Sequence, residues 1–323
     1  MKESFGGFLP FEMPTNIKKE STKVVALQSA RAALKYFINE TYLETVWLPA
    51  YTCDALFDVF DNTNVNVKIY NITNKFSIEK SINLGKFDVI VYVNYFGLNE
   101  HNIRLLAHQY PAENIIIDNS QAYFSKCNEF LASIYSPRKF FGVPDGGLLK
   151  SMAVLKSSIE DSDMNLDNCR HLFERLLDKR DVAYRHYVSA EGKFQDLTPK
   201  RISALTEMIL DYTDTDRVSD IRMRNFNYYN SKLAKYNQLD LSMECAPLCY
   251  PFLSEKYIPK ELLIQKNIFL PTYWKDALFR NINEFETRLI NSALYLPLDQ
   301  RYDFEDLDFI IDTIMKIVCE GKI

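Results

Sequence analysis

Several kinds of segment and site are missing from this chain of 323 residues. Its six cysteines include no CxxC pair and its four histidines do not cluster, so the sequence lacks the ligand spacing of a zinc site. No apolar run approaches the roughly 20 residues that a membrane-spanning helix needs, and the N-terminus has no apolar run of signal-peptide length. We therefore expect a cytoplasmic protein that has reduced thiols, surface histidines, no metal and no membrane segment.

An excess of positive charge is also absent. The chain has 38 lysines and arginines against 43 aspartates and glutamates, which gives a net charge of −5. A protein that binds nucleic acid usually carries a basic excess, so we expect no nucleic-acid partner. The hydrophobic share of 47% and the charged share of 25% are typical of a globular protein. At this length we expect two domains, or one large domain with an appendage.

The first half of the chain alternates short β-rich runs with amphipathic stretches. Short strands that are apolar on both faces, separated by helices, indicate a mainly parallel sheet that is covered on both sides, which is an α/β fold. The predicted strands are Val24–Leu27, Thr45–Leu48, Val65–Tyr70, Val89–Asn94, Asn114–Asp118, Ala132–Tyr135 and Leu148–Leu155. The predicted helices between them are Ala30–Asn39, Cys53–Asp61 and Asn102–Tyr110.

The second half has a different character. Residues Ile159–Tyr187 and Ile202–Leu233 are helical in period, and the last hundred residues mix short strands with a final helix. We expect strands at Ile268–Leu270 and Ala293–Pro297 and a helix near Phe304–Cys319. The predicted organisation is a large α/β domain at residues 1–205 and a smaller α+β domain at residues 206–323.

Ser29 begins the first of three segments that suit a ligand site. A strand ends at Leu27 and a helix starts near Ala30, so Ser29 is a good N-cap and the first-turn N–H groups are free to hold an anion. Ligands of α/β sheets bind at the carboxyl ends of the strands, and this junction lies there. A strand–serine–helix junction is also common as a plain helix cap, so this segment alone does not decide the function.

Asp118 and Lys139 mark the other two segments. Asp118 ends a strand of three isoleucines, and a carboxylate is costly to bury there unless it meets a cation. Lys139 follows an apolar strand, and we expect its neighbours Phe140 and Phe141 to remove its solvation and so to favour imine formation. Read singly, the aspartate could be a local cap and the lysine an ordinary loop residue.

Together the three segments resemble the DegT/DnrJ/EryC1/StrS family of pyridoxal 5'-phosphate (PLP) dependent aminotransferases, which have the fold-type I, aspartate aminotransferase-like fold. That family carries an S-G-T-x-A-L-like turn, then D-x-x-Q, then P-x-K-x-x-x-x-x-[DE]-G-G. This chain has Ser29–Leu34, then Asp118 and Gln121, then Pro137–Gly147, and Lys139 lies 21 residues after Asp118. Looser matches are residues 48–52, 93–97 and 295–298.

The resemblance implies PLP as the cofactor and a role for each matching residue. Lys139 would form the Schiff base, Asp118 would pair with the pyridine N–H, and Gln121 would contact the side of the 3'-oxygen. Some cofactor-binding residues match the family motifs, and others would replace family residues that this chain lacks. The full set is Ser29, Ala30, Arg31, Tyr51, Asp118, Gln121, Ser136 and Lys139. The backbone N–H groups of Ala30 and Arg31 would hold the phosphate.

The chain departs from the family at several positions. Cys53 stands where the family has an aromatic residue that stacks on the PLP ring, and Tyr51 or Tyr95 could replace it. Ile134 stands where a serine is common, and Ser136 or Ser133 could take over its phosphate contact. The segment that reaches the partner subunit keeps only its arginine, as Arg201, and the histidine of the V-H-x-Y-G motif is Asn94.

The function that follows from the resemblance is an aminotransferase, active as a homodimer with each site near the subunit boundary. It would move an amino group from glutamate to a keto-sugar nucleotide, for a surface polysaccharide or a secondary metabolite. Candidates for the cation that binds the donor carboxylate are Arg31, Arg138 and Arg201. Some relatives in the family are sugar dehydratases, in which a histidine replaces the lysine. The presence of Lys139 argues against that reaction here. A PLP enzyme for a non-sugar substrate and a non-catalytic PLP-binding relative remain as alternatives.

Overall fold

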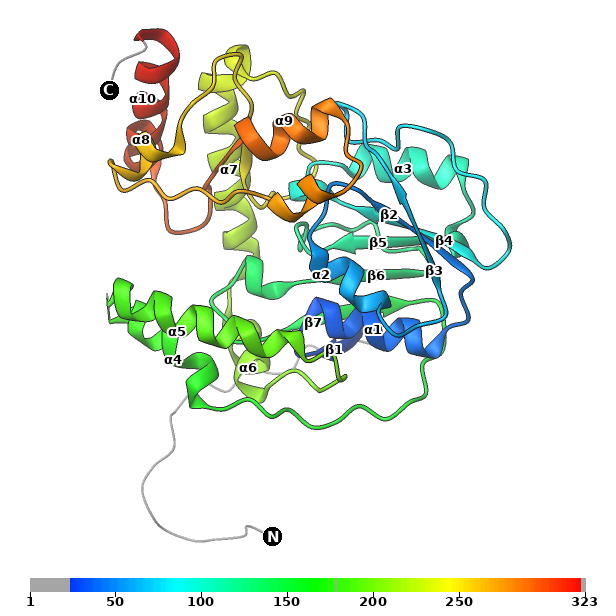
Figure 1. Cartoon of the computed structure of the whole chain (residues 1–323). Coiled ribbons are helices and arrows are strands. Elements are labelled where there is room, and N and C mark those ends of the chain that lie inside the picture. Colours follow the sequence, from blue (N-terminus) through cyan, green and yellow to red (C-terminus); the bar gives the residue numbers. More distant parts are fainter. Residues whose placement is uncertain (1–23, 178, 321–323) are drawn as a thin grey trace, which may run out of the picture.

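The computed structural model describes residues 24–177 and 179–320, which include a central seven-stranded sheet (Figure 1). The strand order is β1-β7-β6-β5-β4-β2-β3. The five strands from β6 to β3 run parallel, and β7 runs antiparallel to both of its neighbours. The mainly parallel α/β sheet is therefore confirmed. The strands are β1 (Val24–Leu27), β2 (Thr45–Pro49), β3 (Asn66–Tyr70), β4 (Asp88–Val93), β5 (Ile115–Asn119), β6 (Ala132–Tyr135) and β7 (Gly147–Ser151).

The reversal at β7 follows from its connection. The chain passes from β6 to β7 through a loop with one 3-10 turn, η4 (Pro137–Lys139), instead of a crossover helix. Parallel neighbours need a long crossover, whereas a strand that returns directly must pair antiparallel. The loop that carries Lys139 therefore leaves from the carboxyl end of β6, beside the carboxyl ends of the other parallel strands.

Helices flank the sheet and extend from its carboxyl edge. Helix α1 packs against β1, β6 and β7, and α4 and α5 pack against each other. The helices of this part are α1 (Ala30–Glu40), α2 (Asp54–Phe57), α3 (Glu100–Gln109), α4 (Leu166–Leu176), α5 (Arg180–Gly192), α6 (Ala204–Tyr212) and α7 (Thr215–Leu233). Further 3-10 turns are η1 (Asp58–Phe60), η2 (Tyr95–Gly97), η3 (Ala112–Asn114), η5 (Lys193–Gln195), η6 (Ala234–Tyr236) and η7 (Lys275–Phe279).

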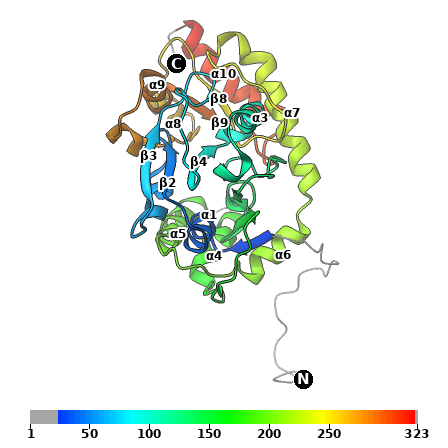
Figure 2. The same ribbon diagram turned by 90° about the vertical axis from the view of Figure 1, so that its right-hand side faces the viewer.

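The C-terminal part contains a second, two-stranded antiparallel sheet, β8 (Tyr250–Phe252) and β9 (Leu294–Leu296). Its helices are α8 (Lys260–Ile264), α9 (Glu284–Ser292) and α10 (Phe304–Glu320), and α10 packs against α7. In Figures 1 and 2 this group lies at the top and α4, α5 and α6 lie at the bottom. One cluster of buried apolar side chains includes members of both parts, so the core is continuous.

Most predicted elements are present, but some need correction. The strand predicted at Leu148–Leu155 is β7, which begins at Gly147 and ends at Ser151. Ile268–Leu270 is not a strand, because Phe269 is 72% exposed and the chain has just left a turn at Asn267 with a φ of 59°. The region Ile159–Tyr187, predicted to be helical, begins with an irregular stretch, and its helices are α4 and the start of α5. Strand β8 was not predicted. The division of the domains at residue 205 stays a prediction, and α6 crosses that position.

Candidate active site

The start of α1 and the Asp145-Gly146-Gly147 turn lie against each other. Ser29 caps α1, because its Oγ accepts from the N–H of Ala32 at 3.1 Å. The N–H of Gly146 donates to the carbonyl of Gln28 at 2.8 Å. A Cβ on Gly147 would lie closer than 3.0 Å to three backbone atoms of Ser29 and Ala30. The second glycine is therefore required by a close approach of two backbones, which joins the first and third segments of the sequence.

The end of β5 presents one carboxylate, and the turn after it presents one unpaired amide. Asp118 is half-buried, and its Oδ1 accepts from the N–H of Ser120 at 2.8 Å. Gln121 is 1% exposed, and its Oε1 accepts from the N–H of Phe96 at 3.1 Å. Its Nε2 is buried and has no partner among the described residues. A buried donor without a partner costs about 1–3 kcal/mol, so this amide is suited to an acceptor on a bound molecule.

Lys139 ends the η4 turn and its side chain is exposed. The expectation that the two phenylalanines bury it is wrong. Phe140 and Phe141 are 2% and 6% exposed, and their rings turn into a cluster with Tyr123 and Phe124. The amino group of Lys139 therefore stays accessible at the carboxyl edge of the sheet, while the chain beside it is firmly packed.

Cys53 follows β2, and its thiol is influenced by the charges of both predicted catalytic residues. Burial raises the pKa of its thiol, the ammonium of Lys139 opposes that shift, and the carboxylate of Asp118 adds to it. The parallel strands β2, β5 and β6 end at the same edge of the sheet, and these three residues lie at or just after those ends. The position at which the sequence resemblance predicts a stacked aromatic ring is thus occupied by a partly buried thiol.

Tyr51 and Tyr95 are both fully buried in a cluster of aromatic rings at the junction of the two parts of the chain. The hydroxyl of Tyr51 lies 2.6 Å from that of Tyr295, and the hydroxyl of Tyr95 donates to the carbonyl of Tyr51 at 2.9 Å. The ring of Tyr51 is 4.8 Å from that of Trp274, centroid to centroid. These contacts make both rings part of the packed core, and their predicted stacking on the cofactor stays a prediction. Ser136, the other residue chosen to complete the pattern, is buried at the start of η4.

The three candidate arginines have different environments. Arg138 pairs with Glu191 of α5 and lies 4.0 Å from the ring centroid of Phe194, and burial lowers its pKa to about 10. Arg201 is exposed and lies 3.7 Å from Asp161. Arg31 is half-buried and forms no ion pair with a carboxylate in the described part of the chain. Arg31 is therefore the candidate whose guanidinium is left for a ligand.

Asp145, to which sequence reasoning assigned no role of its own, has a structural role, and one histidine is buried. Asp145 is fully buried, and its carboxylate accepts from the N–H and the hydroxyl of Ser203 at 2.9 and 2.8 Å and from the hydroxyl of Thr206. It therefore ties the turn after Lys139 to the start of α6, and the capping pattern of Ser203 and Thr206 was the signal for it. His171 is 8% exposed, so the expectation that every histidine lies on the surface is wrong.

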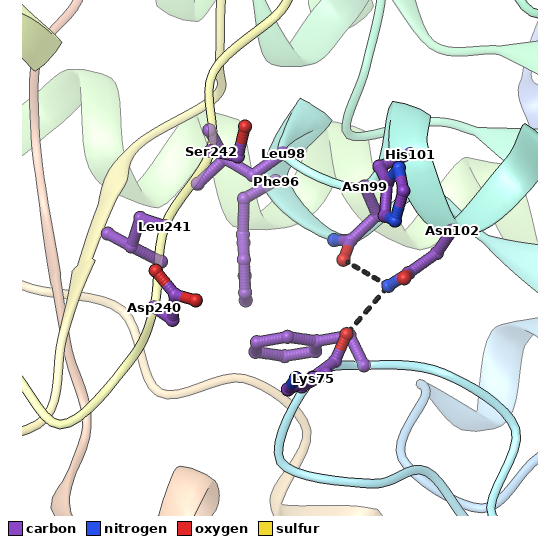
Figure 3. A pocket seen from close by; sticks show the side chains of 10 residues that line it. Lys75, Phe96, Leu98, Asn99, His101, Asn102, Asp240, Leu241 and Ser242 are labelled. Atoms are coloured by element: carbon purple, nitrogen blue, oxygen red, sulfur yellow. Dashed lines mark hydrogen bonds between the residues drawn. The ribbon is translucent and has the colours of Figure 1, made fainter.

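A separate cavity of about 250 Å³ opens beside α3 (Figure 3). Asn99 and Asn102 lie on one side of Phe96 in this view, and Asp240 lies on the other. The amide of Asn102 donates to the carbonyl of Lys75 at 2.6 Å and to the side-chain oxygen of Asn99 at 3.0 Å. These polar groups of the cavity wall therefore bind one another. None of the predicted cofactor-binding residues lines it.

No family model matches this sequence, and no curated protein is significantly similar to it. Solved structures are similar in fold. The GDP-4-keto-6-deoxy-D-mannose-3-dehydratase of Escherichia coli, with bound hydrated PLP, is 15% identical, with a TM-score of 0.63 over 91% of this chain and 87% of that chain. The sugar aminotransferase CalS13 of Micromonospora echinospora is 14% identical, with a TM-score of 0.60 over 90% and 86% of the two chains.

A third match is a DegT DnrJ EryC1 StrS aminotransferase from Brucella abortus, which is 16% identical, with a TM-score of 0.60 over 91% of this chain and 85% of that chain. This chain has the fold of the DegT/DnrJ/EryC1/StrS aminotransferases. The resemblance that the sequence motifs indicate is therefore confirmed at the level of the fold, over nine-tenths of the chain. In the described residues, no helix is long and apolar enough to cross a membrane, and no three side chains are placed to hold a metal.

Proposed function

We propose that this protein is a PLP-dependent aminotransferase that moves an amino group from glutamate to a keto-sugar nucleotide. The observation that carries the proposal is the placement of Asp118 and Lys139 at the carboxyl ends of the neighbouring parallel strands β5 and β6, in a fold shared with PLP enzymes. The unpaired Nε2 of Gln121, in the turn that begins at Asp118, supports it further.

The residues at this edge fit PLP. Asp118 has one carboxylate oxygen on the N–H of Ser120, which leaves the other to accept from the ring N–H. Gln121 would donate its buried Nε2–H to the 3'-oxygen, and the first turn of α1, next to Arg31, would hold the phosphate. When bound, PLP supplies the electron sink for the reaction. Lys139 would hold the cofactor through its amine, and the same amine would move a proton at the substrate carbon.

The sugar part of the proposal rests on the similar structures, which include a sugar aminotransferase and an enzyme named for a GDP-linked keto-sugar. The product would then serve a surface polysaccharide or a secondary metabolite. Arg31 is the proposed cation for the carboxylate of glutamate, because Arg138 is already paired with Glu191. A planar guanidinium suits a carboxylate through two parallel hydrogen bonds.

We also propose a homodimer that covers the α4–α5 hairpin. Large apolar side chains on or next to these two helices are exposed in the single chain, and large exposed apolar patches often mark an interaction surface. They are Leu166 (79%), Phe173 (41%), Leu176 (82%), Leu177 (66%), Tyr184 (67%), Tyr187 (43%) and Val188 (52%). A light-scattering mass of one chain at working concentration, with full activity, would exclude the dimer.

Absorbance spectroscopy tests the proposed reaction in two halves. Purified protein with PLP should show a cofactor band that borohydride fixes on Lys139, and glutamate should convert the band to that of pyridoxamine phosphate. A keto-sugar nucleotide should restore it. Lys139→Ala is the control and should carry no covalent cofactor after borohydride. If small 2-oxo acids restore the band and no keto-sugar nucleotide does, the sugar assignment is wrong and the PLP chemistry stands.

A further inference from the structure

Phe140, the residue that follows Lys139, is held much more firmly than the lysine. Its side chain is 2% exposed, and its ring centroid lies 5.9 Å from that of Tyr123 and 5.7 Å from that of Phe124. These two aromatic residues belong to the turn that begins at Asp118. Because the side chain of Lys139 is exposed, the backbone position of the lysine depends on this packed neighbour.

Two further contacts reach Phe140 from distant parts of the chain. The Nε2 of Gln300 donates to the carbonyl oxygen of Phe140 at 3.0 Å, across 160 positions of the sequence. The guanidinium of Arg222, from α7, lies 4.7 Å from the centroid of the Phe140 ring. Both the backbone and the side chain of Phe140 are therefore fixed from outside the seven-stranded sheet.

Arg222 is a buried cation that lacks the usual partner. It is 2% exposed, and its Nη1 donates to the carbonyls of Pro247 and Leu248 at 3.1 and 3.2 Å. None of the described carboxylates forms an ion pair with it, and its Nε has no partner in the same part of the chain. Burial lowers its pKa to about 10, which still leaves it charged at neutral pH. The carboxylate of Asp299 attracts the guanidinium without forming an ion pair with it, and the face of the Phe140 ring attracts the cation as well.

Gln300 has one satisfied and one unsatisfied end. Its Nε2 binds the carbonyl of Phe140, whereas its Oε1 is buried without a partner among the described residues. A buried acceptor without a partner is destabilising, so stability alone does not account for a glutamine at this position. The neighbouring Asp299 is held by Arg301 at 2.7 and 2.8 Å, which fixes the segment that carries Gln300.

We propose that Gln300 and Arg222 are positioning residues, which hold Phe140 by its carbonyl oxygen and its ring and thereby place Lys139 for reaction. The proposal rests on the proposed function, because that function gives Lys139 its imine-forming role. A reacting group has to be held within about 0.5 Å of its productive position by neighbours that are themselves fixed. Neither residue touches the reacting atoms, and both act through Phe140. The C-terminal part of the chain, and not the sheet alone, would then set the position of the lysine.

The variants Gln300→Leu and Arg222→Met each remove one contact with Phe140. The control on the same helix is Lys232→Met, because the ammonium of Lys232 lies over a different ring, that of Tyr228, at 5.5 Å. Arg222→Lys keeps a cation near the ring and should recover part of the loss. If Arg222→Met fails to fold, Gln300→Leu and Arg222→Lys carry the test.

The first measurement uses protein without cofactor. The N–H groups of Phe140 and Phe141 both donate to the carbonyl of Pro137 at 2.9 Å, so their hydrogen exchange reports opening of the Lys139 turn. We expect about tenfold faster exchange at these two amides in Gln300→Leu and Arg222→Met, and none in the control. The second measurement uses PLP-loaded protein. The rate constant of the half-reaction with glutamate should fall about tenfold, while the KM for glutamate stays within about threefold.

Each result decides one of the two proposals. Unchanged exchange in both variants overturns the positioning role, and so does faster exchange with an unchanged half-reaction. A slower half-reaction without faster exchange also overturns it, because the effect would not pass through Phe140. If borohydride fixes no PLP on Lys139 in the parent protein, the proposed function fails. The exchange measurement then still decides whether Gln300 and Arg222 hold the turn.

Discussion

Gly147 offers a direct test of the contact between the Lys139 loop and the start of α1. A Cβ at this position would overlap the carbonyl group of Ser29 and the nitrogen of Ala30, and all three atoms are backbone. Backbone cannot rotate away as a side chain can, so Gly147→Ala has to push β7 and α1 apart. The displaced atoms belong to the helix start that we assign to the cofactor phosphate.

The size of the effect follows from this geometry. Overpacking a tight site costs about 1–3 kcal/mol, and three backbone overlaps place Gly147→Ala at about 3 kcal/mol or more. A thermal melt of the cofactor-free protein should then fall by about 6 °C, because 1 kcal/mol corresponds to about 2 °C in a long chain. If the same displacement is felt at the phosphate, PLP affinity should weaken about 100-fold, since 1.4 kcal/mol is tenfold.

Gly142→Ala is the matched control in the same loop. A Cβ there meets no atom within 4 Å, so this variant should melt and bind PLP like the parent. Melting is measured by calorimetry and PLP affinity by absorbance titration. Equal melting temperatures for Gly147→Ala and Gly142→Ala would show that the close approach at Gly147 is not a constraint. If Gly147→Ala loses stability but keeps its PLP affinity, the start of α1 does not bind the cofactor.

The remaining predictions concern the strand ends. Asp118→Asn should lower turnover about 100-fold or more, since a charge aimed at a developing charge is commonly worth about 3 kcal/mol, and steady-state rates within a few-fold of the parent would contradict its role. Gln121→Glu keeps the acceptor for Phe96 and removes the unpaired donor, so an absorbance titration should show PLP affinity about tenfold weaker. Alkylation of Cys53 in cofactor-free protein should be slower in Lys139→Met, which removes the charge that lowers the thiol pKa, and faster in Asp118→Asn, which removes a charge that raises it. Mass spectrometry of the labelled peptide measures both rates. Identical rates in the two variants would show that Lys139 and Asp118 do not act on the thiol of Cys53.

The sheet was predictable because its strands are signalled locally. Two of its strands are apolar on both faces, at Ile115–Ile117 and Val89–Val93. This pattern is typical of a strand that is covered by other layers on both sides. Ser29, Asp118 and Lys139 were found because each follows such a strand, and the topology then brings strand ends to one edge. The ends of β7 and the false strand at Ile268–Leu270 show the limit of this signal, since short apolar runs also occur in exposed or irregular chain.

The environment of the lysine was not predictable from its neighbours. Phe140 and Phe141 are adjacent to Lys139 in sequence, yet their rings turn toward Tyr123 and Phe124 and leave the lysine exposed. The direction of a side chain in a loop depends on the backbone angles of the turn, and no periodic pattern reports them. The 3-10 turn of Pro137–Lys139 reverses the chain, so that adjacent residues point to different sides.

The contacts that hold the candidate site come from much further away than the motifs that identify it. Glu191 meets Arg138, Arg222 and Gln300 meet Phe140, and each partner is separated from the loop by at least one helix. Glutamine, glutamate and arginine are mostly exposed in proteins, so nothing in their local sequence marks them as buried or bridging. A chemical motif can be recognised from its spacing because a cofactor requires particular residues at fixed positions along one edge of the sheet. The side chains that hold the motif residues in place need only reach them. Different proteins can therefore supply these supporting side chains from different helices or loops. Substitutions outside the motifs are therefore where this chain is expected to differ most from proteins of the same fold.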